Sequence, residues 1–354
     1  MELHGGNIYK LKRETGIEVI DYSANINPFG LSDKLKKGII ENLYVLEKYP
    51  DPEYISMKKI IADYNKVEID NIIVGNGATE IMFLYAKSLK PKKVLIVSPT
   101  FAEYERALKS TNCHVEYFQL KEDEDFILNI PRLKKTLDET YDLLVICNPN
   151  NPTGKFIKKN ILDDLAKFCM IKDTKILLDE AFIEFVEGNL SQSILEYKNK
   201  NVFIVRALTK FFAIPGLRLG YGITFDKKLK EKIESSREPW SINAIAELAT
   251  KILLEDNEYI EKSENWIRIE KEYMYKKLSS IKGIKTYKTE TNFILVKLIN
   301  DMKIGEFRQK MILLGVLVRN ASNFNYLDDS YFRLAIKDRI NNIKVLGCIE
   351  DAIR

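Results

Sequence analysis

Between residues 72 and 223, the chain alternates short apolar runs with longer stretches whose apolar residues recur at helical spacing. Short runs rich in Val, Ile and Leu predict buried strands, and the stretches between them predict helices. This alternation is typical of an α/β fold with a mostly parallel sheet and helices on both faces. We predict seven strands, at 72–74, 94–97, 115–118, 143–147, 175–178, 202–205 and 221–223.

The pattern differs on the C-terminal side of this region. Predicted helices at 241–254 and 266–278 lead out of the sheet, and strand-like runs then occur at 291–298, 315–319 and 331–336. An amphipathic helix is predicted at 303–314, between the first two of these runs. These elements predict a second, smaller α+β domain.

The N-terminal segment is predicted to complete that small domain. Ser32 is a plausible N-cap for a helix that ends near Leu46, and two prolines within residues 49–52 then interrupt the chain. We therefore predict three parts. They are an N-terminal segment of the small domain at 1–48, a large domain at 49–260 and a small C-terminal domain at 261–354.

Charge and cysteine content exclude several classes of protein. The 55 basic and 51 acidic residues give a net charge of +4 and are scattered along the chain, which argues against a nucleic-acid partner. Four separated cysteines and two histidines support neither a disulfide framework nor a metal site. No apolar run approaches the roughly 20 residues of a membrane span. We expect a cytoplasmic protein with no membrane partner.

A lysine stands in an apolar, glycine-punctuated stretch at residues 206–222. Among Phe211, Phe212 and Ile214, the Lys210 amine should lose hydration, so its pKa should fall toward neutrality, and a neutral amine can condense with an aldehyde. Arg218 follows behind a Pro-Gly turn and could place a fixed cation beside a phosphate on that aldehyde. The alternative is an ordinary lysine whose stem is buried and whose head reaches water.

Polar clusters follow several of the predicted strands, where ligands gather in α/β sheets. The cluster at 75–80 could cradle a phosphate at a helix N-terminus, although a turn with an N-cap explains it equally well. Phe101 could stack on a flat ring or belong to the core. The turn at 148–154 aims Asn151 at a fixed point. Asp179 could hold a pyridinium N–H or cap the next helix.

Taken together, the motifs resemble the pyridoxal 5′-phosphate-dependent fold-type I enzymes, the aspartate aminotransferase superfamily. The resemblance rests on NPTG at 151–154, DEAF at 179–182, Thr209-Lys210 and Arg218, and it covers essentially the whole chain. It implies a homodimer with a shared active site and a seven-stranded large domain. It also implies that Lys210 and Asp179 are catalytic, with Lys210 forming the Schiff base and Asp179 holding the pyridine nitrogen.

The resemblance further assigns the remaining cofactor contacts. Asn151 would bind the phenolic oxygen, Phe101 would stack on the ring, and Tyr49 would reach the phosphate bound by the partner subunit. The implied cofactor-binding set is Gly77, Ala78, Thr79, Phe101, Asn151, Asp179, Thr209, Lys210, Arg218 and Tyr49.

Two residues depart from the pattern of that superfamily. Ala207 stands where a Ser or Thr usually binds the phosphate, and Phe182 replaces a tyrosine that binds the phenolic oxygen. Loss of that hydrogen bond weakens the case for an ordinary aminotransferase.

Within the superfamily, the chain is similar to two branches, the threonine-phosphate decarboxylases and the histidinol-phosphate aminotransferases. HGGN at 4–7 and SANINP at 23–28 resemble the decarboxylases, which implies conversion of O-phospho-L-threonine to (R)-1-amino-2-propanol phosphate and CO2. The implied substrate-binding set is His4, Gly5, Asn25, Asn151, Arg319 and Arg333, with Arg333 holding the carboxylate. An aminotransferase acting on histidinol phosphate or a similar amine is the alternative. A non-catalytic binding protein of the same fold is a third hypothesis.

Overall fold

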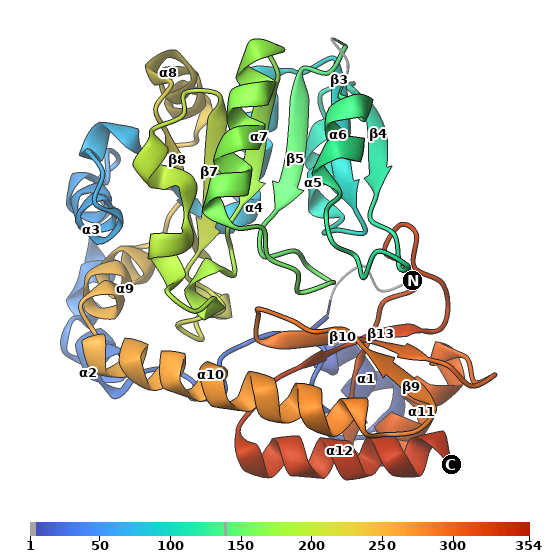
Figure 1. Ribbon diagram of the computed structural model, residues 1–354. Coiled ribbons are helices and arrows are strands. Elements are labelled where there is room, and N and C mark those ends of the chain that lie inside the picture. Colours follow the sequence, from blue (N-terminus) through green and yellow to red (C-terminus); the bar gives the residue numbers. More distant parts are fainter. Residues whose placement is uncertain (1–4, 138–139) are drawn as a thin grey trace.

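The computed structural model describes residues 5–137 and 140–354. A seven-stranded sheet forms the upper layer in Figure 1, and a smaller sheet lies below it. Each of the seven predicted strands is present, and their order across the sheet is β2-β8-β7-β6-β5-β3-β4. Only β8 runs antiparallel to its neighbours, so the prediction of a mostly parallel α/β sheet is confirmed. The strands are β2 (Ile72–Asn76), β3 (Lys93–Ser98), β4 (His114–Gln119), β5 (Leu143–Cys147), β6 (Lys175–Asp179), β7 (Val202–Ala207) and β8 (Leu219–Thr224).

Helices cover both faces of this sheet, which explains why its central strands are apolar throughout rather than alternating. Leu95 and Val97 of β3 belong to one hydrophobic cluster, and Val94 and Ile96 belong to another. The first cluster includes residues of α3, α6 and α7, and the second includes residues of α4, α5 and α8. The helices of this region are α3 (Ile55–Asn65), α4 (Gly77–Leu89), α5 (Glu103–Lys109), α6 (Ile130–Thr136), α7 (Lys159–Ile171), α8 (Lys227–Ser236) and α9 (Ala244–Leu254).

The lower sheet has the strand order β12-β13-β10-β9 and is antiparallel. Its strands are β9 (Ile284–Thr286), β10 (Phe293–Leu298), β12 (Arg319–Asn320) and β13 (Tyr331–Ala335), and α11 (Ile304–Leu313) and α12 (Arg339–Ile353) pack nearby. We did not predict β9, which is only three residues long. The predicted strand at 315–319 is two short strands, β11 (Val316–Leu317) and β12.

The N-terminal segment contributes to this lower layer. Strand β1 (Ile20–Asp21) pairs parallel with β11, and Ala335 of β13 donates its N–H to the Tyr22 carbonyl at 2.9 Å. Helix α1 (Ile8–Thr15) precedes β1. Ser32 caps α2 (Asp33–Glu41) as predicted, because its Oγ accepts from the Leu35 N–H at 3.1 Å.

Helix α10 (Asn257–Ser279) connects the two layers (Figure 1). It runs continuously through residue 260, where we placed a boundary, and the three-part division remains a prediction. Short 3-10 helices cover Leu43–Glu47, Ile69–Asn71, Ile183–Phe185, Asn189–Gln192, Ile194–Tyr197 and Pro215–Leu217. Across 5–137 and 140–354, no helix is long and apolar enough to cross a membrane.

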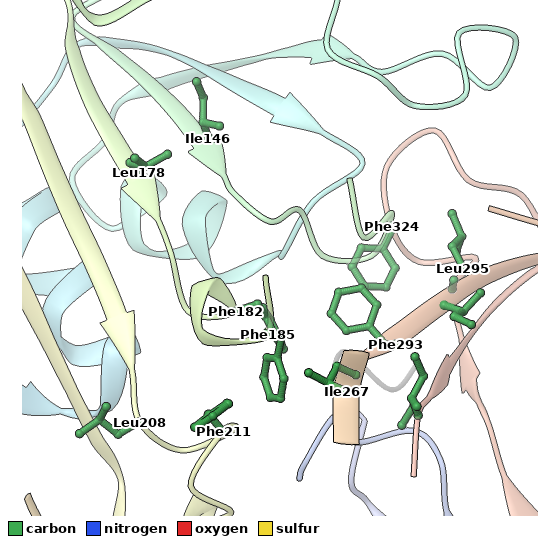
Figure 2. Close-up of a cluster of buried hydrophobic side chains, with 14 of the residues drawn as sticks. Ile146, Leu178, Phe182, Phe185, Leu208, Phe211, Ile267, Phe293, Leu295 and Phe324 are labelled. Carbon is green, nitrogen blue, oxygen red and sulfur yellow. The ribbon is translucent and has the colours of Figure 1, made fainter. Parts of the chain in front are cut away.

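Aromatic side chains fill the junction between the layers. Figure 2 shows Phe182 and Phe185, which follow β6, beside Phe293 of β10 and Ile267 of α10. The Phe182 and Phe293 rings meet edge to face, with centroids 5.1 Å apart. The two layers therefore share one core, and the polar ends of the strands meet above it.

Candidate active site

A cavity of about 660 Å³ lies where the carboxyl ends of the large-sheet strands face the small domain. Most of the predicted site residues line it, although they come from segments far apart in the sequence. The lining includes Gly5, Asn25, Ala78, Thr79, Phe101, Asn151, Asp179, Thr209, Lys210, Arg218, Arg319 and Arg333.

Lys210 follows the end of β7, and it is partly buried beside the apolar residues of its own turn. Burial and the neighbouring Arg218 cation together lower the pKa of its amine to about 8, which is the predicted direction. The backbone of the turn is fixed as well, because the Lys210 carbonyl accepts from the Asn27 N–H at 3.1 Å. The N-terminal segment thus holds the lysine in place.

Asp179 ends β6 with 3% of its surface exposed. One carboxylate oxygen accepts from the Ala181 N–H at 2.8 Å, and the other accepts from the Tyr104 hydroxyl at 2.5 Å. Burial raises the pKa of the Asp179 carboxyl, and the two hydrogen bonds oppose that rise because they stabilise the ionised form. The hydrogen bond from Ala181 is a local cap and involves only one carboxylate oxygen. The hydrogen bond from Tyr104 joins residues far apart in the sequence, so tertiary structure positions the other oxygen.

The N-terminus of α4 and Arg218 form a cradle suited to an anion. Gly77 has φ +83°, and a Cβ there would lie 2.8 Å from Arg218 Nη2, so a side chain would displace the guanidinium. Gly220 of β8 is also required, since its Cβ would lie 2.3 Å from the Ala78 nitrogen. Free N–H groups at a helix start, beside an arginine, bind phosphate favourably.

Arg333 enters the cavity from the small domain. Its Nη1 donates to Asn151 Oδ1, and its Nη2 donates to the Ser23 carbonyl at 2.8 Å. Its Nε is buried and has no hydrogen-bond partner among residues 5–137 and 140–354. Burial and the neighbouring Arg319 cation together lower the pKa of the Arg333 guanidinium to about 9.

Arg319 lies directly opposite Arg333, because the two are paired residues of the antiparallel strands β12 and β13. Both side chains are buried, at 5% and 6% exposure. Arg319 donates to the Asn320 carbonyl at 2.5 Å and to Asn323 Oδ1 at 2.8 Å. Like charges opposite each other on neighbouring strands repel, so their placement is costly unless an anion joins them.

The N-terminal loop closes one side of the cavity. The Gly6 N–H donates to Ser23 Oγ at 2.8 Å, and a Cβ on Gly5 would lie 2.1 Å from the Ser23 carbonyl oxygen. Only glycine fits at that contact. Asn25 is buried and its Oδ1 has no partner in the part of the chain that the structure describes. His4 lies outside the described residues, so its predicted role stays a prediction.

Comparisons with known proteins identify the family of this chain. Residues 17–346 match the family described as aminotransferase class I and II. The chain belongs to this family. Its fold therefore agrees with the resemblance on which the site residues were predicted.

Individual relatives represent both branches. A Caldanaerobacter subterraneus subsp. tengcongensis protein, provisionally named a threonine-phosphate decarboxylase, is 41% identical over 353 residues, covering 99% of this chain and 93% of that protein. The threonine-phosphate decarboxylase of Salmonella typhimurium is 33% identical over 353 residues, covering 99% and 96%. The crystal structure of the histidinol-phosphate aminotransferase from Clostridium acetobutylicum has a TM-score of 0.88 at 37% identity, covering 94% and 98%. These identities and the TM-score do not distinguish the threonine-phosphate decarboxylases from the histidinol-phosphate aminotransferases.

Class I and II aminotransferases and their relatives are pyridoxal 5′-phosphate-dependent enzymes, so the predicted enzyme class and cofactor are confirmed. The residues of the cavity fit the cofactor. Lys210 would supply an amine of lowered pKa for its aldehyde, and Asp179 would supply a buried carboxylate for its ring nitrogen. Arg218 and the start of α4 would hold its phosphate.

Sequence reasoning missed two residues that line the cavity. A third residue, which it assigned to the site of the partner subunit, lies outside this cavity. Tyr104 and Phe324 line the cavity but carry no motif of their own; Tyr104 could have been found from its position three residues after Phe101. Tyr49 lies away from the cavity, 80% exposed, with its ring 4.8 Å from that of Trp240. Its predicted reach into a partner subunit stays a prediction.

Proposed function

We propose that this protein decarboxylates O-phospho-L-threonine, releasing CO2 and (R)-1-amino-2-propanol phosphate. The observation that carries the proposal is the pair of buried arginines, Arg319 and Arg333, opposite each other on the cavity wall. Phosphothreonine carries two anionic groups a few bonds apart, a carboxylate and a phosphate. Histidinol phosphate carries only the phosphate.

Different residues bind the two anionic ends of the substrate. Arg333 binds the carboxylate with its free Nε and the remaining N–H groups of its terminal nitrogens, while Asn151 and Ser23 hold the guanidinium in place. Arg319, with the Gly5 loop, binds the phosphate. Two charge-assisted contacts at opposite ends fix the orientation of the bond at Cα.

The bound cofactor supplies a protonated pyridine ring that accepts the electron pair of a breaking Cα bond. Asp179 keeps the ring nitrogen protonated because a buried carboxylate favours a neighbouring cation. Loss of CO2 breaks the bond from Cα to the carboxyl carbon, and a proton takes its place on Cα. Lys210 can carry that proton, since the pKa of its amine is about 8.

A second candidate is amino transfer from histidinol phosphate. It is favoured by the 37% identity to the solved aminotransferase, which covers 94% of this chain. Phe182 argues against it, because its ring offers no hydroxyl to the phenolic oxygen of the cofactor. The third hypothesis, a non-catalytic protein, does not explain why Lys210, Asp179 and Arg218 all meet in one cavity.

We also propose that two copies pair and share their active sites. An exposed apolar surface runs from the 3-10 helix Leu43–Glu47 to Trp240, and it includes Tyr44 at 63% and Tyr49 at 80% exposure. A groove of about 370 Å³ lies beside it. Large exposed apolar surfaces of this kind are typical of subunit interfaces. Light scattering of the purified holoenzyme should give the mass of two chains.

The deciding experiment measures both reactions on one preparation of the holoenzyme. We expect CO2 release from phosphothreonine in the absence of any keto acid, and no amino transfer from histidinol phosphate to 2-oxoglutarate. Rapid transfer without CO2 release would overturn the decarboxylase proposal and leave the aminotransferase alternative.

A further inference from the structure

Each of the two cavity arginines lies over the ring of a phenylalanine. The Arg333 guanidinium carbon is 5.2 Å from the Phe293 ring centroid, and the Arg319 guanidinium carbon is 5.4 Å from that of Phe324. Both distances fall within the range of cation–π attraction, which strengthens when the pair is removed from water. All four side chains are buried, with 7% exposure at most.

The two rings come from different structural settings. Phe293 begins β10 and is held from the large-domain side by the edge-to-face contact with Phe182, as Figure 2 shows. Phe324 lies in the loop between β12 and β13, where its N–H donates to the Ala321 carbonyl at 3.1 Å. Phe324 also lines the cavity, whereas Phe293 is not among the residues that line it.

We infer that Phe293 and Phe324 are positioning residues, each of which holds one arginine by its ring face in the orientation that meets one end of the substrate. The inference rests on the proposed function, since it assigns the carboxylate end to the ring of Phe293 and the phosphate end to the ring of Phe324. A ring is suited to this role because it attracts a cation without neutralising it. A carboxylate in the same place would compete with the substrate for the guanidinium.

Phe182 takes part in the same aromatic junction. Its ring contacts both Phe293 and Phe185, and it also lines the cavity. The ring therefore supports Phe293 from the large-domain side.

The test replaces one ring at a time in the holoenzyme and measures phosphate recognition. Phe324→Leu keeps an apolar side chain but removes the π face. We expect the KM for phosphothreonine to rise about tenfold with little change in kcat, and the KM for unphosphorylated threonine to stay the same. Phe324→Tyr keeps the ring face and should restore the KM, because the cavity gives its hydroxyl room.

Phe307→Leu is the matched control. Phe307 packs on Phe332 with centroids 4.8 Å apart, and Phe332 points to the opposite face of β13 from Arg333 because successive strand residues alternate. This variant should lose thermal stability without changing either KM. Phe293→Leu should differ from both, raising the KM for phosphothreonine and for threonine alike.

A second measurement does not depend on turnover. Inorganic phosphate should raise the Tm of the holoenzyme, and Phe324→Leu should weaken its apparent affinity by about tenfold, as Arg319→Ala does more strongly. If Arg319→Ala leaves phosphate affinity unchanged, the proposed phosphate site fails and the inference fails with it. If Arg319→Ala weakens phosphate binding but Phe324→Leu does not, or if the leucine variant changes both substrates equally, only the role of the ring is overturned.

Discussion

Two groups of buried charges in this protein have opposite surroundings. Glu180 and Arg206 form a sealed ion pair at 0% exposure, with Nε and Nη2 of the arginine 3.0 and 2.6 Å from one carboxylate oxygen. Arg319 and Arg333 are nearly as buried, but they face each other across two strands and border a cavity. Burial of a charge is therefore not evidence of function by itself. The useful distinction is whether the buried charge borders a cavity that a ligand can enter.

Adjacent residues illustrate the same difference. Asp179 and Glu180 follow one another at the end of β6, and side chains that follow one another along a strand point in opposite directions. Asp179 lines the cavity, while Glu180 is bound by Arg206 and by Ser193 Oγ. One acidic residue is available to the cofactor, and the other joins two segments of the fold.

Loss of the cavity lysine should have the largest effect. We expect Lys210→Ala to abolish activity and the visible absorbance of bound cofactor, because the reactive amine is removed, while the Tm of the cofactor-free protein changes little. Borohydride reduction followed by peptide mapping checks this. A cofactor adduct on another lysine in the variant would contradict the assignment.

Substitution of the two adjacent acids should have different effects, one on activity and the other on stability. Asp179→Ala should lower kcat by about 100-fold or more while the chain stays folded, because the ring nitrogen loses the partner that keeps it protonated. Glu180→Ala should instead lower the free energy of unfolding by about 3–5 kcal/mol, since Arg206 would be left buried without its partner. Urea denaturation and steady-state kinetics on both variants would separate these outcomes. If the two variants lost the same kcat and the same free energy of unfolding, the distinction between the two acids would be wrong.

Another buried acid, Glu184, should make the stability of the folded chain depend on pH. Both carboxylate oxygens of Glu184 are buried without hydrogen-bond partners within the described ranges, and burial raises the pKa of this carboxyl to about 7. Between about pH 4.5 and 7 the folded state keeps the proton while the unfolded chain releases it, so stability falls as pH rises. The cost should reach about 3 kcal/mol above pH 7.

Glu184→Gln should remove that cost. We expect the variant to be more stable than the parent at pH 8 and nearly equal to it at pH 5, as measured by urea denaturation at both values. An equal gain at the two pH values would show that the carboxyl does not titrate in this range.

The smallest effect in this comparison is expected for Arg319. Arg319→Ala should raise the KM for phosphothreonine by about 10- to 100-fold, in line with about 1.5–3 kcal/mol for a charge-assisted contact, and should barely change the KM for threonine. Parallel steady-state assays on both substrates would measure this. Equal losses on both would indicate a structural or carboxylate-binding role for Arg319.

Much of the fold could be predicted because most strands of the large sheet are buried on both faces, the edge strand β4 being the exception. Such buried strands must be apolar throughout, and that signal is local. Strand β9 was missed because three residues, only one of them fully buried, carry no period. The predicted strand at 315–319 divides at Val318, since β11 pairs with the N-terminal β1 and β12 pairs with β13. Partners distant in the sequence decided that division.

The sequence by itself determined which chemistry was available. Lys210 in an apolar turn, Asp179 at a strand end and Gly77 at a helix start follow from local pattern, because burial, strand ends and helix starts have short-range signatures. Only the tertiary structure decided that these groups lie around one cavity. The opposition of Arg319 and Arg333, the Tyr104 contact to Asp179 and the rings beneath the two arginines depend on strand register and on packing between domains. Those contacts join residues up to 75 positions apart, and no local pattern encodes them.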